Sequence, residues 1–218
     1  MIPLKGDTPR RTIPFTTLAL LSLNIAAFVY ELSLPPHRQK TLFFEMGLVP
    51  AHVTAALTST PASTPASAPG PALGSAFSPV LTSMFLHAGL LHLAGNMLFL
   101  WVFGNNVEDE TGHVGFLAFY LMCGVAAAAT QIVALPRSDI PMVGASGAIA
   151  GVLGAYMVLF PRSRILTLVP IFIFVRLMYL PAVLVLGLWF VYQVLLSSTT
   201  GMADESGGGS GGGVAFYA

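Results

Sequence analysis

Ser146 lies among small residues near the start of an apolar stretch, within the sequence Gly144-Ala145-Ser146-Gly147. Two interpretations of this hydroxyl are open. Glycine and serine occur where membrane helices pack closely, and Gly147 and Gly151 have the four-residue spacing of such a packing motif. Alternatively, Ser146 is a nucleophile at the start of a helix, and the neighbouring glycines let a substrate backbone approach it.

Three more polar residues interrupt an apolar stretch further upstream. His87, His92 and Asn96 lie within residues 80–103, which we predict to form one membrane helix. Polar groups inside a bilayer are costly unless each has a partner or lines a cavity. His92 and Asn96 are four residues apart and therefore share a helix face, whereas we expect His87 to lie well off that face.

These three side chains allow three roles. They can hold neighbouring helices together by hydrogen bonds. Metal binding is less well supported, because His92 and Asn96 are a weak ligand pair and no carboxylate lies nearby in the span; we expect no metal and no organic cofactor. An imidazole and an amide aimed at one point can also stabilise the oxyanion that forms when a serine attacks a carbonyl group.

The composition is that of a membrane protein. Of the 218 residues, 55% are hydrophobic and 8% are charged, whereas soluble domains carry about 25% charged residues. The nine basic and nine acidic residues balance, and no basic run predicts nucleic-acid binding. The single cysteine, Cys123, lies in an apolar stretch and is expected to be a buried thiol.

We predict an all-α polytopic membrane protein with five membrane spans, because a spanning helix needs about 20 mostly apolar residues. A short stretch before the last span, residues 165–175, is interrupted by prolines and is predicted to be interfacial or re-entrant. The predicted spans are residues 13–32, 80–103, 114–135, 142–160 and 180–196.

The remaining segments flank or connect this membrane domain of residues 13–196. Residues 1–12 form a cytoplasmic N-terminal segment. The long first connection contains an apolar part, residues 41–57, that we expect in the membrane interface, and a part rich in Pro, Ala, Ser and Thr, residues 58–71, that we expect to be disordered. Residues 197–218 are interpreted as a glycine-rich loop and the start of a truncated sixth helix.

The lysines and arginines predict the orientation, because they are more frequent on the cytoplasmic side. A cytoplasmic N-terminus places Ser146 near the outer face, at a depth similar to the outer half of the second span. It also places six basic residues in the cytoplasm: Lys5, Arg10, Arg11, Arg162, Arg164 and Arg176. The three on the opposite side are Arg38, Lys40 and Arg137.

The pattern His87-x-x-x-x-His92-x-x-x-Asn96, followed by Gly144-x-Ser146-Gly147, resembles the rhomboid family of intramembrane serine proteases. The resemblance covers about residues 13–196, and three separated motifs occur in the family's order. Supporting segments are Gly104-Asn105-Asn106-Val107-Glu108-Asp109, Pro161-Arg162-Ser163-Arg164-Ile165, and Pro181-Ala182 with Leu186-Gly187-Leu188-Trp189-Phe190.

This resemblance implies a six-helix bundle, five helices of which are present here, that cleaves transmembrane substrates. Ser146 would be the nucleophile, and His92 and Asn96, with the Ser146 backbone amide, would form the oxyanion hole. His87 would hold the first loop in place, and Gly144 and Gly147 would be structural residues near the site. We expect a multi-pass protein of a bacterial plasma membrane whose partners are lipids and transmembrane substrates, and the oligomeric state is open.

The sequence departs from the family at the general base, which the family carries as a histidine in its sixth helix. All five histidines of this chain precede Ser146. We therefore expect the 218-residue chain to be inactive and the protein from which it comes to be a protease. The alternative is a non-catalytic rhomboid-like protein that binds client transmembrane segments. Retention of Ser146, His92 and Asn96 favours the protease, because a binding protein has no chemical need for them.

Overall fold

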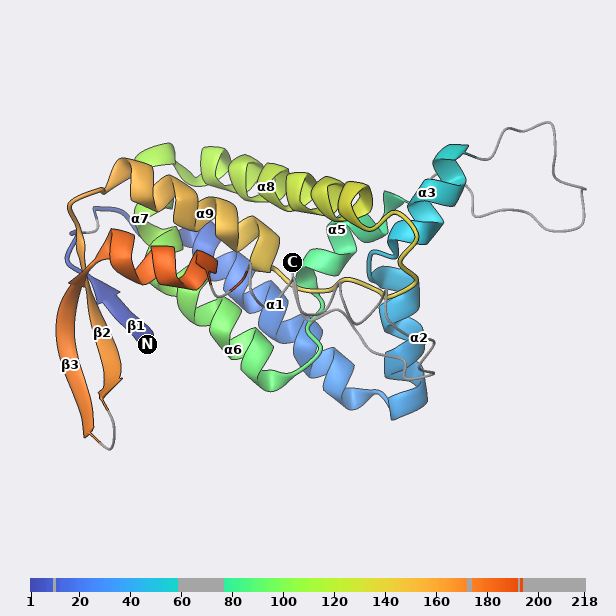
Figure 1. Cartoon of the computed structure of the whole chain (residues 1–218), viewed down its shortest axis with the longest axis horizontal. Helices are drawn as coiled ribbons and strands as arrows, with labels where there is room; N and C mark the ends of the chain where they lie inside the picture. Colours follow the sequence, from blue (N-terminus) through green and yellow to red (C-terminus); the bar gives the residue numbers. More distant parts are fainter. Residues whose placement is uncertain (10, 59–76, 172–173, 192, 194–218) are drawn as a thin grey trace, which may run out of the picture.

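The computed structural model describes residues 1–9, 11–58, 77–171, 174–191 and 193. In this part of the chain, helices form a bundle and a three-stranded antiparallel sheet crosses one end of it (Figure 1). The elements are, in order, β1 (Ile2–Gly6), α1 (Phe15–Ser33), α2 (Pro36–Met46), α3 (Pro50–Thr58), α5 (Pro79–Thr82), the 3₁₀ turn η1 (Ser83–Phe85), α6 (Leu90–Phe99), the π-helical turn η2 (Leu100–Gly104), α7 (Asn105–Thr111), α8 (His113–Ala134), α9 (Ser146–Leu159), β2 (Arg164–Ile171), β3 (Phe174–Pro181) and a helix at Ala182–Val191.

The helices correspond to the predicted membrane spans. Among the described residues, α1 and α8 are each long and apolar enough to cross a bilayer. The helices Pro79–Phe85 and Leu90–Thr111 meet this criterion together, as a pair bent by 93°. Two shorter apolar helices, α9 and Ala182–Val191, lie at the fourth and fifth predicted spans. The chain is therefore a helical, multi-pass membrane protein, as predicted.

The second span differs from the prediction, because it is broken between η1 and α6 rather than being one continuous helix. In a continuous helix, the His87 N–H would donate to the Ser83 carbonyl. Instead, the His87 N–H donates to the Glu31 carboxylate at 3.1 Å, and the Ser83 carbonyl accepts the Gly144 N–H at 2.9 Å. These two tertiary hydrogen bonds replace the helical one and stabilise the bend.

The fourth span also begins later than predicted, at Ser146 rather than at residue 142. Met142 forms an antiparallel bridge with Leu48 of the first loop, through N···O distances of 2.8 and 3.0 Å. Gly144 then has a φ of +128°, which is incompatible with a helix. As a result, Ser146 becomes the first residue of α9, which starts beside the middle of α8 in Figure 1.

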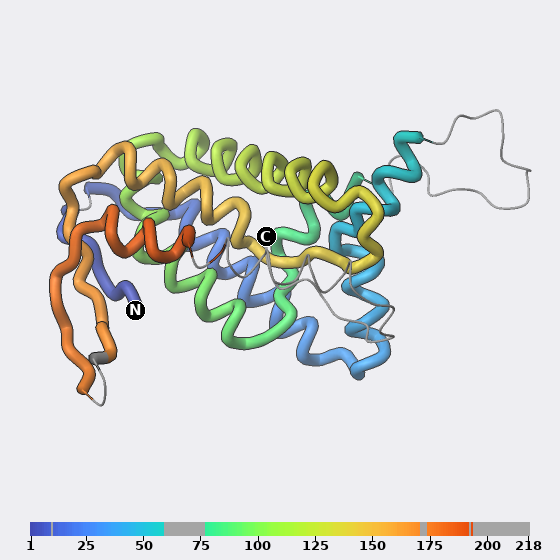
Figure 2. Tube along the Cα trace, viewed as in Figure 1, coloured from blue at the N-terminus to red at the C-terminus, as the bar shows by residue number. Residues whose placement is uncertain are grey.

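The stretch before the last helix, predicted to be interfacial or re-entrant, forms a β-hairpin, and its place relative to the membrane stays a prediction. Strands β2 and β3 pair along their whole length, with Leu168 opposite Leu177, and β1 pairs with β2 from its other side. Pro170 is tolerated in the central strand because β1 pairs with β2 only between Ile165 and Leu168. Figure 2 shows that β3 leads directly into the last helix.

Three predictions concern residues outside the described part of the chain. The first is the disorder of residues 58–71, of which the structure describes only Thr58, the last residue of α3. The second is the end of the fifth span at residue 196. The third is the loop and the start of a sixth helix in residues 197–218.

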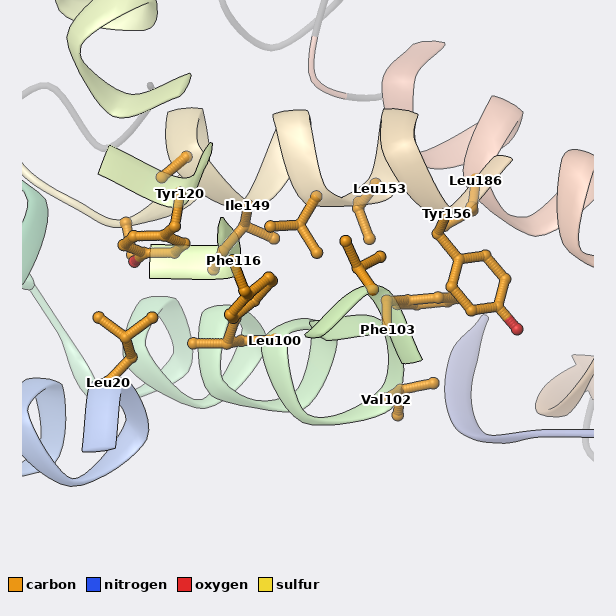
Figure 3. Packing of buried hydrophobic residues seen from close by; sticks show 14 of the residues in the cluster. Leu20, Leu100, Val102, Phe103, Phe116, Tyr120, Ile149, Leu153, Tyr156 and Leu186 are labelled. Atoms are coloured by element: carbon orange, nitrogen blue, oxygen red, sulfur yellow. The ribbon is translucent and has the colours of Figure 1, made fainter. Parts of the chain in front are cut away.

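The core lies between α1, η2, α8 and α9. Figure 3 shows the side chains of Leu100, Phe116 and Ile149 meeting inside the bundle. Phe103 and Tyr156 pack edge to face, with ring centroids 4.9 Å apart. The core extends along the whole of α9 and therefore fixes the height of Ser146 within the bundle.

Acidic side chains of α7 hold the N-terminus of α1. No side chain of the helix's own N-cap region caps it. Instead, the buried Glu108 carboxylate accepts the N–H groups of Thr16 and Thr17 at 2.8 and 2.7 Å and the Thr17 hydroxyl at 2.6 Å. Asp109 accepts the N–H groups of Arg11 and Thr12, both at 2.8 Å. The motif around Glu108 is thus a cap supplied from another helix.

Candidate functional site

Ser146 is buried at the first position of α9, directly after the turn at Gly144. A Cβ atom placed on Gly144 would lie 2.9 Å from His92 Nε2, 2.7 Å from His92 Cε1 and 3.6 Å from Ser146 Oγ. The imidazole of His92 and the hydroxyl of Ser146 therefore flank the same small space. Only glycine fits there, because of both its positive φ and the lack of room for a side chain.

Asn96 and His87 form a second polar contact beside His92. Asn96 is buried on α6, and its Nδ2 lies 3.0 Å from His87 Nε2. With the amide as donor, the imidazole of His87 accepts through Nε2 and carries its proton on Nδ1. This hydrogen bond engages one of the two Asn96 N–H groups.

The expectation that His87 lies well off the face of His92 and Asn96 is wrong. The rings of His87 and His92 contact each other edge to face, with centroids 5.2 Å apart, in addition to the hydrogen bond from Asn96. The cause is the break between η1 and α6. Helical spacing separates positions 87 and 92, but the bent chain folds His87 back over the start of α6.

Glu31 is a member of this group that the sequence analysis missed. It lies in the last turn of α1, is buried, and accepts the backbone N–H of His87. A cavity of about 240 Å³ adjoins it, lined also by Gln39, His87 and Gly89. The side-chain amide of Gln39 donates to the Glu31 carbonyl at 2.8 Å, which links the first loop to this corner. The sequence could have indicated this role, because Glu31 is a carboxylate inside a predicted membrane span.

Gly151, in the second turn of α9, serves helix packing. A Cβ atom on Gly151 would overlap the Sγ and Cβ atoms of Cys123 on α8, so α8 and α9 approach closely at this point. Both interpretations of the stretch therefore have a structural counterpart. Gly151 belongs to a helix contact, whereas Ser146 faces the polar group of α6.

The other histidines lie away from Ser146. His113, at the start of α8, is 2.6 Å from the Glu108 carboxylate through Nδ1, near the sheet end of the bundle. His37 and His52 lie in α2 and α3. In the described residues, no group of three or more His, Cys, Asp or Glu side chains is placed to hold a metal ion.

The arrangement combines a hydroxyl with hydrogen-bond donors, which are two of the parts that acyl transfer needs. Ser146 offers a hydroxyl, and its own N–H belongs to the first turn of α9, where N–H groups lack helical acceptors and the helix dipole favours negative charge. His92 and Asn96 add side-chain donors on the facing helix. These donors can stabilise an oxyanion that forms next to Ser146.

Comparison with known proteins places these residues in one family. The Rhomboid domain model matches residues 75–218. The chain is 42% identical over 76 residues to Rhomboid-like protein 11, chloroplastic, of Arabidopsis thaliana, a match that covers 35% of this chain and 27% of the relative. It is 37% identical over 100 residues to the mitochondrial Presenilin-associated rhomboid-like protein of Homo sapiens, covering 44% of this chain and 26% of the relative.

A third relative carries an activity in its name. The chain is 44% identical over 78 residues to Rhomboid protease GluP of Bacillus subtilis, covering 36% of this chain and 15% of the relative. In these three relatives, the matched region spans about a quarter of the protein or less. No solved structure matches the chain.

Proposed function

The chain belongs to the rhomboid family, and from this premise we propose that it is an intramembrane serine endopeptidase that cleaves transmembrane protein substrates. The observation that carries the proposal is the convergence of Ser146 and His92 on the space beside Gly144. The similarity to a relative named a rhomboid protease supports it.

In the proposed reaction, Ser146 Oγ attacks the carbonyl carbon of the scissile peptide bond. The resulting oxyanion is stabilised by the Ser146 N–H, by His92 and by the second N–H of Asn96. His87 keeps Asn96 in place through its hydrogen bond. The tetrahedral intermediate then expels the amine, and water hydrolyses the acyl-enzyme to release the second product.

The hydroxyl proton of Ser146 must pass to a base and then to the leaving amine. In the rhomboid family this base is expected to be a histidine of the sixth helix, whereas the five histidines of this sequence all precede Ser146. His92 is the histidine beside Ser146, but as the base it would cease to be an oxyanion donor. In the proposed Ser-His dyad the base is this sixth-helix histidine, and we call a chain that carries it the extended chain.

Proteolysis of a transmembrane substrate in reconstituted vesicles tests the proposal. The extended chain is expected to cleave, and its Ser146→Ala variant is not. Asn96→Ala should lower turnover by a factor on the order of 10² to 10³, the usual effect of losing one oxyanion donor. Cleavage that survives Ser146→Ala would refute the assignment of the nucleophile.

The alternative is a non-catalytic rhomboid-like protein that binds client transmembrane segments, and two of the three relatives described above carry no activity in their names. Such a protein would capture a transmembrane peptide equally well with or without the Ser146 hydroxyl, and no form of it would cleave. Binding without cleavage by the extended chain would establish this alternative.

We also propose that the N-terminus faces the cytoplasm of a bacterium. The sheet end of the bundle contains Lys5, Arg162 and Arg176, whereas Arg38 and Lys40 belong to α2 at the other end (Figure 1). A reporter enzyme active only in the cytoplasm, fused to Met1, should be active. An inactive fusion at Met1 with an active fusion in the loop at Arg137 would reverse the orientation.

A further inference from the structure

The β2–β3 hairpin is anchored in the bundle at its base and exposed towards its tip. At the base, Ile165 and Thr167 are fully buried, and Leu180 packs against the core. Towards the tip, Phe174, Val175 and Leu177 are 65%, 63% and 60% exposed. In Figure 1, β2 and β3 cross the end of the bundle at a steep angle to the helices.

The exposed surface of the hairpin is apolar and basic. The two strands contain no Asp or Glu, and Arg164 and Arg176 are their charged residues. Both faces present apolar side chains, because the register puts Leu177 opposite Leu168 on one face and Phe174 and Met178 on the other. An apolar surface of this kind on a monomer marks a contact with a partner or a membrane.

The bilayer is the partner that fits this position. At the same end of the bundle, Phe15 at the start of α1 and Val114 at the start of α8 are 61% and 82% exposed. The apolar outer surface of the spanning helices therefore reaches the end of the bundle at which the hairpin lies. Tyr179, which is 56% exposed, is typical of the membrane–water boundary, and the two arginines match anionic headgroups.

The unpaired backbone groups of β3 determine how deeply the hairpin can lie in the bilayer. The sheet order is β1-β2-β3, so in the described part of the chain β3 is an edge strand whose outer N–H and C=O groups pair with no strand. Such groups cannot lie in hydrocarbon, because water is absent there. The headgroup region satisfies both requirements, since it holds water for the edge and apolar groups for the side chains.

We propose that the β2–β3 hairpin is a membrane-interface anchor that lies in the headgroup region of the leaflet at the sheet end of the bundle and binds anionic lipids through Arg164 and Arg176. This anchor does not depend on the proteolytic activity proposed above. It ties the end of α9 and the start of the last helix to the leaflet surface.

Spin labels on single cysteines test this proposal in the 218-residue chain. The background is Cys123→Ala, and the chain is reconstituted in vesicles of phosphatidylethanolamine and phosphatidylglycerol. Reporters are placed at Leu177 and Phe174, on the two faces of the hairpin. Met122, 63% exposed on α8, is the hydrocarbon control, and Arg137, exposed in the loop after α8, is the aqueous control. Collision rates with oxygen and with a water-soluble nickel chelate measure the depth.

The proposal predicts that both reporters lie between the two controls, several-fold less accessible to nickel than Arg137. Nickel accessibility equal to that at Arg137 would overturn it, and so would accessibility as low as at Met122. Dipolar broadening between labels that persists on dilution in lipid would show that a second copy covers the hairpin, and would also overturn it.

A separate experiment tests whether the hairpin arginines bind anionic lipids. Replacing phosphatidylglycerol by phosphatidylcholine, or introducing Arg176→Gln, should raise nickel accessibility at Leu177. Arg38→Gln, which removes an exposed basic residue from α2, should leave it unchanged. An equal response to both substitutions, or to neither, would refute lipid binding through the hairpin arginines.

Discussion

At the scale of single residues, Gly144 combines a demand of the fold with a demand of the proposed chemistry. Its φ of +128° turns the chain into α9, and its missing side chain leaves the space that His92 and Ser146 share. A methyl group at this position would push the imidazole away from the serine, because the nearest ring atom is 2.7 Å from the Cβ position.

Gly144→Ala should therefore abolish turnover of the extended chain and lower its stability by about 1–2 kcal/mol through backbone strain. Gly112→Ala is the matched control. Gly112 also has a positive φ, of +73°, but nothing lies within 4 Å of its Cβ position. This control should lose similar stability and keep its turnover, as measured by thermal unfolding and substrate cleavage. Normal turnover of Gly144→Ala would contradict the described geometry.

Glu31 carries a second prediction at this scale. Its carboxylate accepts the His87 N–H where the second span is broken, so Glu31→Leu would leave this buried N–H without an acceptor. We expect a loss of about 1–3 kcal/mol in thermal unfolding and reduced turnover, because Asn96 is held through His87.

Glu31→Gln keeps one acceptor oxygen and should restore most of both properties. Glu45→Leu, at an exposed position of α2, controls for adding an apolar side chain and should have little effect. Equal losses in the Gln and Leu variants of Glu31 would show that the hydrogen bond to His87 is not what matters.

At the scale of elements, the structure holds helices in place by contacts from distant parts of the sequence. The cap on α1 is the clearest case. Glu108 of α7 satisfies two N–H groups of the first turn of α1 and the Thr17 hydroxyl. Its negative charge also lies at the positive end of the helix dipole.

Glu108→Ala should lower the free energy of unfolding by on the order of 3 kcal/mol, because buried donors lose a charged acceptor. The melting temperature should fall accordingly. Glu110→Ala is the control two residues away. Its side chain is 38% exposed and pairs with Arg11 at 3.8 Å, and such surface pairs contribute about 0–1 kcal/mol. Similar melting temperatures of the two variants would rule out the capping role.

The contact between α8 and α9 gives another prediction. Gly151→Ala places a methyl group against Cys123 and should destabilise the protein by about 1–3 kcal/mol through overpacking. Adding Cys123→Gly removes the clashing side chain and should recover part of this loss. The double variant therefore distinguishes a packing clash from a general intolerance of substitution in α9. In the second case, the stability losses of Gly151→Ala and Cys123→Gly would simply add.

At the scale of the whole molecule, much of the bundle could be predicted because apolar length is a strong signal. The spans at α1 and α8 were placed within a few residues. The convergence of Ser146 and His92 followed from two motifs and a shared depth, and the structure brings these two residues together. Their catalytic role stays a prediction.

The bend in the second span and the hairpin could not be predicted, because both depend on contacts between residues that are distant in the sequence. The bend after η1 exists because Glu31 and Gly144 take over the hydrogen bonds of a helical turn, and this bend brings His87 to Asn96. The hairpin formed where apolar length alone indicated a short membrane segment, because β1, at the far end of the sequence, pairs with β2. In both cases a distant partner decided the local structure.

The most direct test of the central claim is labelling with a serine-directed phosphonate, followed by mass spectrometry of the modified peptide. The account predicts that the extended chain is modified on Ser146 and that its Ser146→Ala variant is not. Equal labelling of the wild-type and Ser146→Ala chains, or a modified serine elsewhere, would contradict the assignment of Ser146 as the nucleophile.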